Sequence, residues 1–100
     1  MLIVAGTFEV DPELRQEFVR SKEQAMRTSR REAGCHDYVF SVDPLEPGRV
    51  LLFERWEDKA SLAAHLTALR SQPVPEVAPV PAISSELVQY EISTVGALGS

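Results

Sequence analysis

One stretch of the chain places an acid, an indole and an imidazole at spacings that could build a reactive site. Residues 53–58 read Phe-Glu-Arg-Trp-Glu-Asp, and His65 follows Trp56 by nine residues. Side chains two apart on a strand point to the same face, so Glu54 and Trp56 share one side of the strand predicted here. The acid, the indole and the imidazole would surround one volume if the next helix packs on that side.

His65 falls on the apolar side of this next helix. Its position lies within a stripe of leucines that keep helical spacing. The stripe comprises Leu62, Leu66 and Leu69. A histidine directed inward is either a core residue with its hydrogen bonds satisfied or part of a site, and the nearby acid and indole favour a site.

Signals at the ends of helices and strands predict six elements. Asp11 and Asp58 are suited to cap helix N-termini, and Gly34 is suited to end the first helix in a left-handed conformation. The predicted order is a strand at 2–10, a helix at 12–33, strands at 35–42 and 50–57, a helix at 59–70 and a last strand at 85–95. The connector before the last strand cannot form a regular helix or a central strand, because it contains Pro73, Pro75, Pro79 and Pro81.

The order β-α-β-β-α-β predicts an α+β fold of the ferredoxin-like type, with a four-stranded antiparallel sheet and both helices on one face. We expect one domain over residues 1–96 and a frayed C-terminal tail at 97–100. Leu52 and Leu51 point to opposite sides of their strand, so both faces of the sheet are substantially apolar. The helices can cover only one face. We therefore expect the sheet of a second copy to cover the other, in a homodimer.

Composition argues against several classes of function. The formal charge of −5 would repel phosphate backbones. The only basic run, Arg27, Arg30 and Arg31, lies where cations complement the end of a helix, so no nucleic-acid partner is expected. No apolar run approaches the roughly 20 residues that a membrane span needs. The N-terminus lacks the basic segment of a signal peptide, and a cytoplasmic location is the expectation.

The cysteine and metal-ligand content is equally restrictive. Cys35 is the only cysteine, which excludes a disulfide within the chain. Cys35, His36 and Asp37 form a metal-like cluster on paper, but consecutive side chains on a strand point to opposite faces. We therefore expect no metal site.

Four features together carry a family resemblance. They are Glu32-Ala33-Gly34-Cys35 before Tyr38, a hairpin loop with Pro47, the segment Glu54-Arg55-Trp56, and His65 in the second helix. With them the chain resembles the antibiotic biosynthesis monooxygenase family over about residues 2–95. This group of dimeric α+β barrel proteins includes cofactor-free quinol and anthrone oxygenases. Its members share a fold more firmly than a reaction.

The resemblance implies a small, electron-rich aromatic substrate that reacts with dioxygen once it is deprotonated. Such chemistry needs a base, hydrogen-bond donors for the developing oxyanion, and an apolar pocket. His65 suits the role of base, because an unperturbed imidazole titrates near pH 6.5. Glu54 either orients His65, serves as a second candidate base, or forms a structural ion pair with an arginine.

Three further residues are candidates for contact with the substrate. Trp56 could stack on an aromatic ring or simply fill the core. Tyr38 could donate its hydroxyl to a substrate oxygen or be an ordinary half-buried strand residue. Thr7 stands where the haem-degrading relatives carry a catalytic amide, so this role does not transfer, and its hydroxyl is expected only to line the pocket.

The resemblance also bears on cofactors and on the alternative function. The haem-degrading branch takes its axial histidine from the segment after the second helix, and residues 71–81 contain no histidine here. No haem or other cofactor is therefore expected. The alternative is a member of the same fold that does not use oxygen: an isomerase in which His65 moves a proton on a small carbonyl compound, or a ligand-binding protein.

Overall fold

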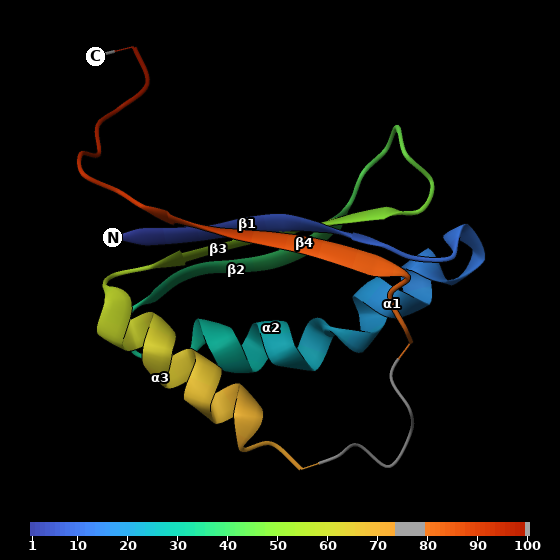
Figure 1. Ribbon diagram of the computed structural model, residues 1–100, viewed down its shortest axis with the longest axis horizontal. Helices are drawn as coiled ribbons and strands as arrows, with labels where there is room; N and C mark the ends of the chain where they lie inside the picture. The colour runs from blue at the N-terminus through green and yellow to red at the C-terminus, as the bar shows by residue number, and fades with distance from the viewer. Residues whose placement is uncertain (74–79, 100) are drawn as a thin grey trace.

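A computed structural model describes residues 1–73 and 80–99. In chain order its elements are β1 (Leu2–Glu9), a 3-10 turn (Pro12–Leu14), α1 (Arg15–Ser21), α2 (Glu23–Arg30), β2 (Cys35–Val42), β3 (Arg49–Trp56), α3 (Lys59–Arg70) and β4 (Ser84–Glu91). The strands form one antiparallel sheet in the order β2-β3-β1-β4. The helices lie together on one side of it (Figure 1), so the predicted ferredoxin-like α+β fold is confirmed. Much of the predicted proline-rich connector lies outside the described residues.

The prediction of one helix over 12–33 was wrong, because the helix divides at Lys22. The Ser21 hydroxyl donates to the carbonyl of Phe18 at 2.6 Å. Such a bond from a serine side chain back to the preceding turn bends helices. The Lys22 amide then bonds Val19 three residues back, at 3.0 Å, in the tighter 3-10 manner. α2 ends at Arg30, three residues earlier than predicted.

β4 is also shorter than the predicted 85–95, for a reason that concerns its partner. β4 pairs with β1 on one side, and the register ends where Leu2 faces Glu91. One more bond follows, from the Ile92 amide to the Met1 carbonyl at 2.9 Å. The ladder with β1 ends at this bond, and the tail leaves the sheet (Figure 1).

The core lies between the helices and the facing side of the sheet. Phe18 from α1 packs against Phe8 and Phe40, with ring centroids 5.5 and 6.3 Å away. The remaining buried apolar residues are Leu2, Val10, Tyr38, Val50, Leu52, Trp56 and Leu62. In the described part of the chain no helix has the length and hydropathy to cross a membrane.

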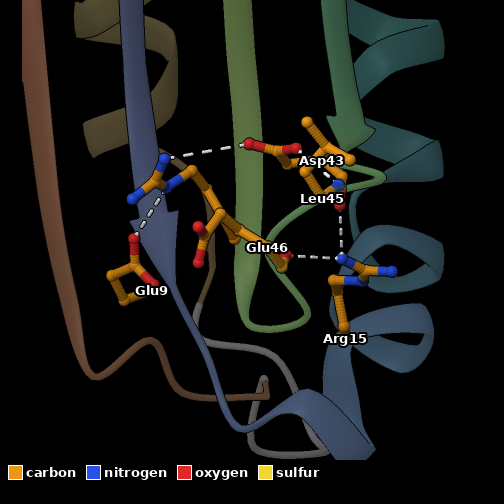
Figure 2. A network of polar contacts seen from close by, with 6 residues as sticks. Glu9, Arg15, Asp43, Leu45 and Glu46 are labelled. Atoms are coloured by element: carbon orange, nitrogen blue, oxygen red, sulfur yellow. Dashed lines mark hydrogen bonds and ion pairs between the residues drawn. The ribbon is translucent and has the colours of Figure 1, made fainter.

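Arg15 fixes the hairpin loop between β2 and β3 against α1. Its Nη1 donates to the carbonyls of Asp43 and Glu46, both at 2.8 Å (Figure 2). Within the loop, Asp43 Oδ1 accepts the amide of Leu45 at 2.9 Å. Beside it, Arg49 of β3 pairs with Glu9 of β1 at 3.1 Å. These contacts attach the loop to both the helix layer and the sheet.

Within residues 1–73 and 80–99, no helix lies on the second face of the sheet (Figure 1). Ladder partners share a face, so residues such as Ala5, Phe53 and Val88, which lie opposite one another across three strands, all point to this side. We call it the open sheet face. Its apolar side chains are Ile3, Ala5, Val39, Leu51, Phe53, Val88 and Tyr90. Arg55 and Asp37 form an ion pair of 2.7 Å beside them.

Gly34 lies in the turn between α2 and β2 and packs against the first turn of α3. Its φ of +81° lies in the left-handed region, as predicted from its position, and a Cβ there would overlap the Ser61 side chain. Its carbonyl accepts the Glu57 amide at 2.8 Å. This turn therefore holds α3 at a fixed distance from the residues that precede β2.

Replacing Gly34 with alanine should lower the free energy of unfolding by at least about 2 kcal/mol, because left-handed strain alone costs about 1–2 kcal/mol and the overlap with Ser61 adds to it. Urea denaturation measures the change. Gly99→Ala is the matched control: Gly99 has a φ of +82° but nothing within 4 Å of its added Cβ. Equal stability of the two variants would contradict the role assigned to the Gly34 contact.

Candidate functional site

A pocket of about 380 Å³ lies between the helix-facing side of the sheet and α3. Its polar lining residues are Tyr38, Glu54, His65 and Gln89. The other described lining residues are apolar, among them Phe40, Leu52, Leu66 and Leu87. Its volume and mainly apolar lining are typical of sites for small organic molecules.

Strand register gathers most of the polar groups into one row. Tyr38 of β2 faces Glu54 of β3, which faces Val4 of β1, which faces Gln89 of β4. All four side chains therefore point toward the helices. The row thus places Tyr38 and Glu54 side by side on one half of the pocket floor, and Val4 separates them from Gln89.

α3 delivers His65 to the pocket from the other layer. Asp58 caps this helix, with its Oδ1 accepting both the amide and the hydroxyl of Ser61 at 2.8 Å. Leu62 and His65 are its two buried residues. The imidazole is 1% exposed, which confirms the prediction that His65 points into the interior.

Two carboxyl groups flank the His65 ring. The Glu32 oxygens lie 3.1 and 3.2 Å from Nδ1. Glu54 Oε1 lies 3.9 Å from Nε2, which is beyond hydrogen-bond distance. Since Glu54 lines the pocket and Glu32 does not, Nε2 is the nitrogen on the pocket side. The rings of Trp56 and Tyr38 complete the surroundings, with centroids 4.7 and 5.3 Å from that of the imidazole.

Glu54 is a buried acid with one strong hydrogen-bond partner. Trp56 Nε1 donates to its Oε1 at 2.9 Å. Burial raises the pKa of Glu54 above its ordinary value, while the bond from Trp56 and the nearby His65 act in the opposite direction. Of the three roles predicted for Glu54, the ion pair is not seen: the acid lies near His65, and it has no arginine partner among the described residues.

Tyr38 remains a phenol at any ordinary pH. Burial, followed by the negative charge of Glu54, raises the pKa of its hydroxyl to about 12. A protonated phenol can donate a hydrogen bond, so Tyr38 is a possible donor to an oxygen atom in the pocket.

The raised pKa of Glu54 predicts a pH-dependent stability difference for Glu54→Gln, which keeps an acceptor for Trp56. Below the ordinary carboxyl pKa the group is protonated in both the folded and the unfolded chain. As pH rises through the raised folded-state pKa, the wild type must ionise a buried acid and loses stability. The variant should therefore be more stable near pH 7, by about 0.5–3 kcal/mol, with little difference below about pH 4. Urea unfolding across this range checks it, and a constant offset would count against it.

The structure brings together four of the five residues predicted for the site. His65, Glu54 and Tyr38 line the pocket, and Trp56 is fully buried behind them, with no place in the lining. Thr7 is not brought together with them. It pairs with Leu51 and Glu86 on the open sheet face, on the far side of the sheet from the pocket.

Sequence reasoning assigned no role to Glu32 or Gln89. Glu32 lies two residues after the last residue of α2, near a helix end where the dipole favours cations. An acid near a helix C-terminus does not stabilise the helix, so its presence indicates another role. Gln89 offered only a weak signal, as a polar residue on the inward side of an edge strand.

No group of three or more metal-ligating side chains exists within residues 1–73 and 80–99. His36, from the cluster considered in the sequence, lies at an irregularity of β2 and pairs with Glu57. Cys35 contacts the core instead.

Comparison with known proteins identifies the family. A family model described as antibiotic biosynthesis monooxygenase matches residues 1–72. An uncharacterised protein of Synechocystis is 36% identical over 64 residues, which are 64% of this chain and 44% of that protein. The chain thus spans less than half the length of this relative. The candidate monooxygenase YcnE of Bacillus subtilis is 28% identical over 65 residues, 65% of this chain and 68% of that one.

Solved structures share the fold at low identity. A candidate antibiotic biosynthesis monooxygenase from Deinococcus radiodurans has a TM-score of 0.74 at 19% identity and covers 100% of both chains. The haem degrader MhuD from Mycobacterium tuberculosis, solved with two haems in its active site, has a TM-score of 0.77 at 14% identity, covering 97% of this chain and 100% of that one. Because the family model spans well over half of its length, the chain belongs to the antibiotic biosynthesis monooxygenase family.

Proposed function

We propose that the protein is a cofactor-independent monooxygenase that oxidises a quinol, an anthrone or a similar electron-rich aromatic with dioxygen. The observation that carries this proposal is the placement of His65. A buried imidazole directs Nε2 toward an otherwise mainly apolar pocket of about 380 Å³. Family membership supports the same reaction class.

In this proposal His65 Nε2 removes a proton from a phenolic hydroxyl or from the acidic CH₂ of an anthrone. The resulting anion gives electrons to dioxygen, one oxygen atom enters the product and the other leaves as water. A quinol plus O₂ gives a hydroxyquinone plus water, so the substrate supplies all four electrons and no external reductant is needed. The apolar lining keeps water from the anion, and the Tyr38 hydroxyl is the proposed donor to its oxygen.

Haem has no place in this proposal, despite the similarity in fold to MhuD. His65 is the only imidazole among the described lining residues of the pocket. In the haem-degrading branch that the sequence resembles, the axial histidine comes from the segment after the second helix, and residues 71–81 contain no histidine. The proposal therefore uses His65 as a base and not as an iron ligand.

Oxygen uptake tests the proposal. Purified protein, treated with chelator and free of visible absorption, should accelerate oxygen consumption by a dihydronaphthoquinone or an anthrone, with the hydroxylated or oxidised product formed at one per O₂. Binding of such a phenol without any oxygen uptake would instead support the alternative, an isomerase or a ligand-binding protein.

We further propose that the open sheet face pairs with the same face of a second copy. This face presents Phe53 and Leu51 with 40% and 38% of their surface exposed, beside Tyr90 at 51%. An apolar surface of this kind on a small domain favours association. Charged pairs such as Arg55 with Asp37 lie beside it and could set the register of the two copies.

A further inference from the structure

Glu32 contacts His65 from outside the pocket, and the function proposed above gives this contact no role. We propose that Glu32 is the positioning residue of the site: its carboxylate holds the proton of His65 on Nδ1 and leaves Nε2 as the basic nitrogen in the pocket. This inference rests on His65 being the base of the proposed function.

An ionised Glu32 allows one assignment of this hydrogen bond. Both Glu32 oxygens lie within 3.2 Å of Nδ1. A carboxylate has only acceptor oxygens, so Nδ1 must carry the hydrogen. In neutral imidazole the other nitrogen then holds a lone pair. Glu54 stands 3.9 Å from that nitrogen, and its near oxygen already accepts from Trp56. Nε2 is thus left for a ligand.

The charged and titratable groups that face His65 come from three directions. Glu32 approaches from the turn after α2, Glu54 from β3, and the Tyr38 phenol from β2. Each of the two acids lies near one ring nitrogen. They differ in access to water, since the side chain of Glu32 is 25% exposed and that of Glu54 is 7% exposed.

His65 holds the substrate proton only between the two halves of the reaction. Nε2 takes one proton from the substrate while Nδ1 keeps its hydrogen bond to the Glu32 carboxylate, so the imidazolium is bonded to that carboxylate. Nε2 then gives the proton to the oxygen atom that leaves as water, and the ring returns to the neutral form with its hydrogen on Nδ1. No net proton leaves the site, in agreement with the conversion of a quinol and O₂ into a hydroxyquinone and water. Glu54 does not replace Glu32 in this role, because it lies beyond hydrogen-bond distance of the ring.

The backbone around Glu32 is built to keep it in place. Its amide bonds Ser29 at 3.0 Å and its carbonyl accepts the Cys35 amide at 3.2 Å. The turn then continues through Gly34, which lies against Ser61 in the first turn of α3. Ser61 precedes His65 by four residues, one helical turn, so the contact that seats Gly34 also sets the distance between the carboxylate and the imidazole.

Nitrogen-15 NMR of the imidazoles tests the tautomer without any substrate. The chain has two histidines, and the exposed His36 serves as an internal reference. In the neutral wild type, His65 should carry its proton on Nδ1, whereas neutral imidazole in water carries it mainly on Nε2. Glu32→Ala should shift His65 toward the Nε2–H form, and Glu32→Asp should retain part of the Nδ1–H form. A wild-type ring with the proton on Nε2, a ring doubly protonated at pH 8, or a tautomer unchanged in Glu32→Ala would overturn the proposal.

Steady-state kinetics supply the second arm. Glu32→Ala should lower kcat about 10- to 100-fold, as removal of a carboxylate that orients a functional imidazole commonly does, with little change in KM because Glu32 does not line the pocket. Added formate should restore part of the rate through the exposed side. Glu57→Ala is the matched control, since it removes the exposed carboxylate that pairs with the other histidine. An unchanged kcat in Glu32→Ala, or an equal loss in Glu57→Ala, would refute the role.

The two arms separate this inference from the proposed function. If wild-type protein consumes no oxygen with any phenol but shows the Glu32-dependent tautomer, the oxygenase proposal fails and the positioning role of Glu32 stands. If oxygen uptake requires His65 but the His65 tautomer is the same in Glu32→Ala as in the wild type, the positioning role of Glu32 fails and the oxygenase proposal stands.

Discussion

His65→Ala should lose nearly all acceleration of oxygen uptake while the fold is retained. General-base catalysis contributes on the order of 10²- to 10⁴-fold, so the loss should lie in this range. The reason is specific to position: Nε2 is the one imidazole nitrogen that faces the pocket, and the neighbouring acid is itself disfavoured as an anion by burial. Oxygen-electrode rates with a dihydronaphthoquinone measure the effect.

Two further variants make the His65 result interpretable. His36→Ala removes the other histidine, which is exposed and bonded to Glu57, and should leave the rate unchanged. His65→Gln keeps a polar side chain of similar size but cannot accept a proton at neutral pH. A His65→Gln protein with the wild-type melting temperature and the wild-type rate would show that His65 is a core residue and would direct attention to Glu54 as the base.

Phe53→Asp should convert a dimer into a monomer. Wild-type protein at micromolar concentration should sediment at near twice the 11.1 kDa of one chain. At the centre of the open sheet face, a new carboxylate would be desolvated without a partner in the paired state, at a cost of several kcal/mol. In a separated chain the same side chain would meet water, because Phe53 is 40% exposed there.

The control for the dimer is an apolar residue outside the open sheet face. Leu45 lies in the hairpin loop with 87% of its surface exposed, and Leu45→Asp should leave the assembly state intact. A wild-type protein that sediments as a monomer at all concentrations would remove the dimer proposal. A Phe53→Asp protein that remains a stable dimer would place the interface on another surface.

Local signals accounted for most of the fold. The helix at Lys59–Arg70 and the strand at Cys35–Val42 have the predicted bounds. Caps and glycines act within a few residues, so Asp58 and Gly34 could be interpreted without knowledge of the rest of the chain. The division of the first helix at Lys22 could not, because it depends on which hydrogen bond the Ser21 hydroxyl selects.

The end of β4 shows a different limit of sequence reasoning. Residues 92–95 have a composition that suits a strand, yet a strand exists only where a neighbour supplies hydrogen-bond partners. The neighbour is β1, whose paired region begins at Leu2. Strand length was therefore set by the partner and not by the propensity of β4.

The sequence by itself determined that His65 faces inward and that Glu54 and Trp56 share one face of β3, because both conclusions follow from the periods of a helix and a strand. Only the tertiary structure decided which acid contacts which nitrogen. Glu32 and His65 are 33 residues apart and meet because the turn at Gly34 seats α2 beside α3. The tertiary structure also decided that Thr7 lies on the opposite face from the pocket. The register of β1 with β3 and β4 determines which of its side chains point to each face of the sheet. Contacts between layers arise from packing, and no local pattern encodes them.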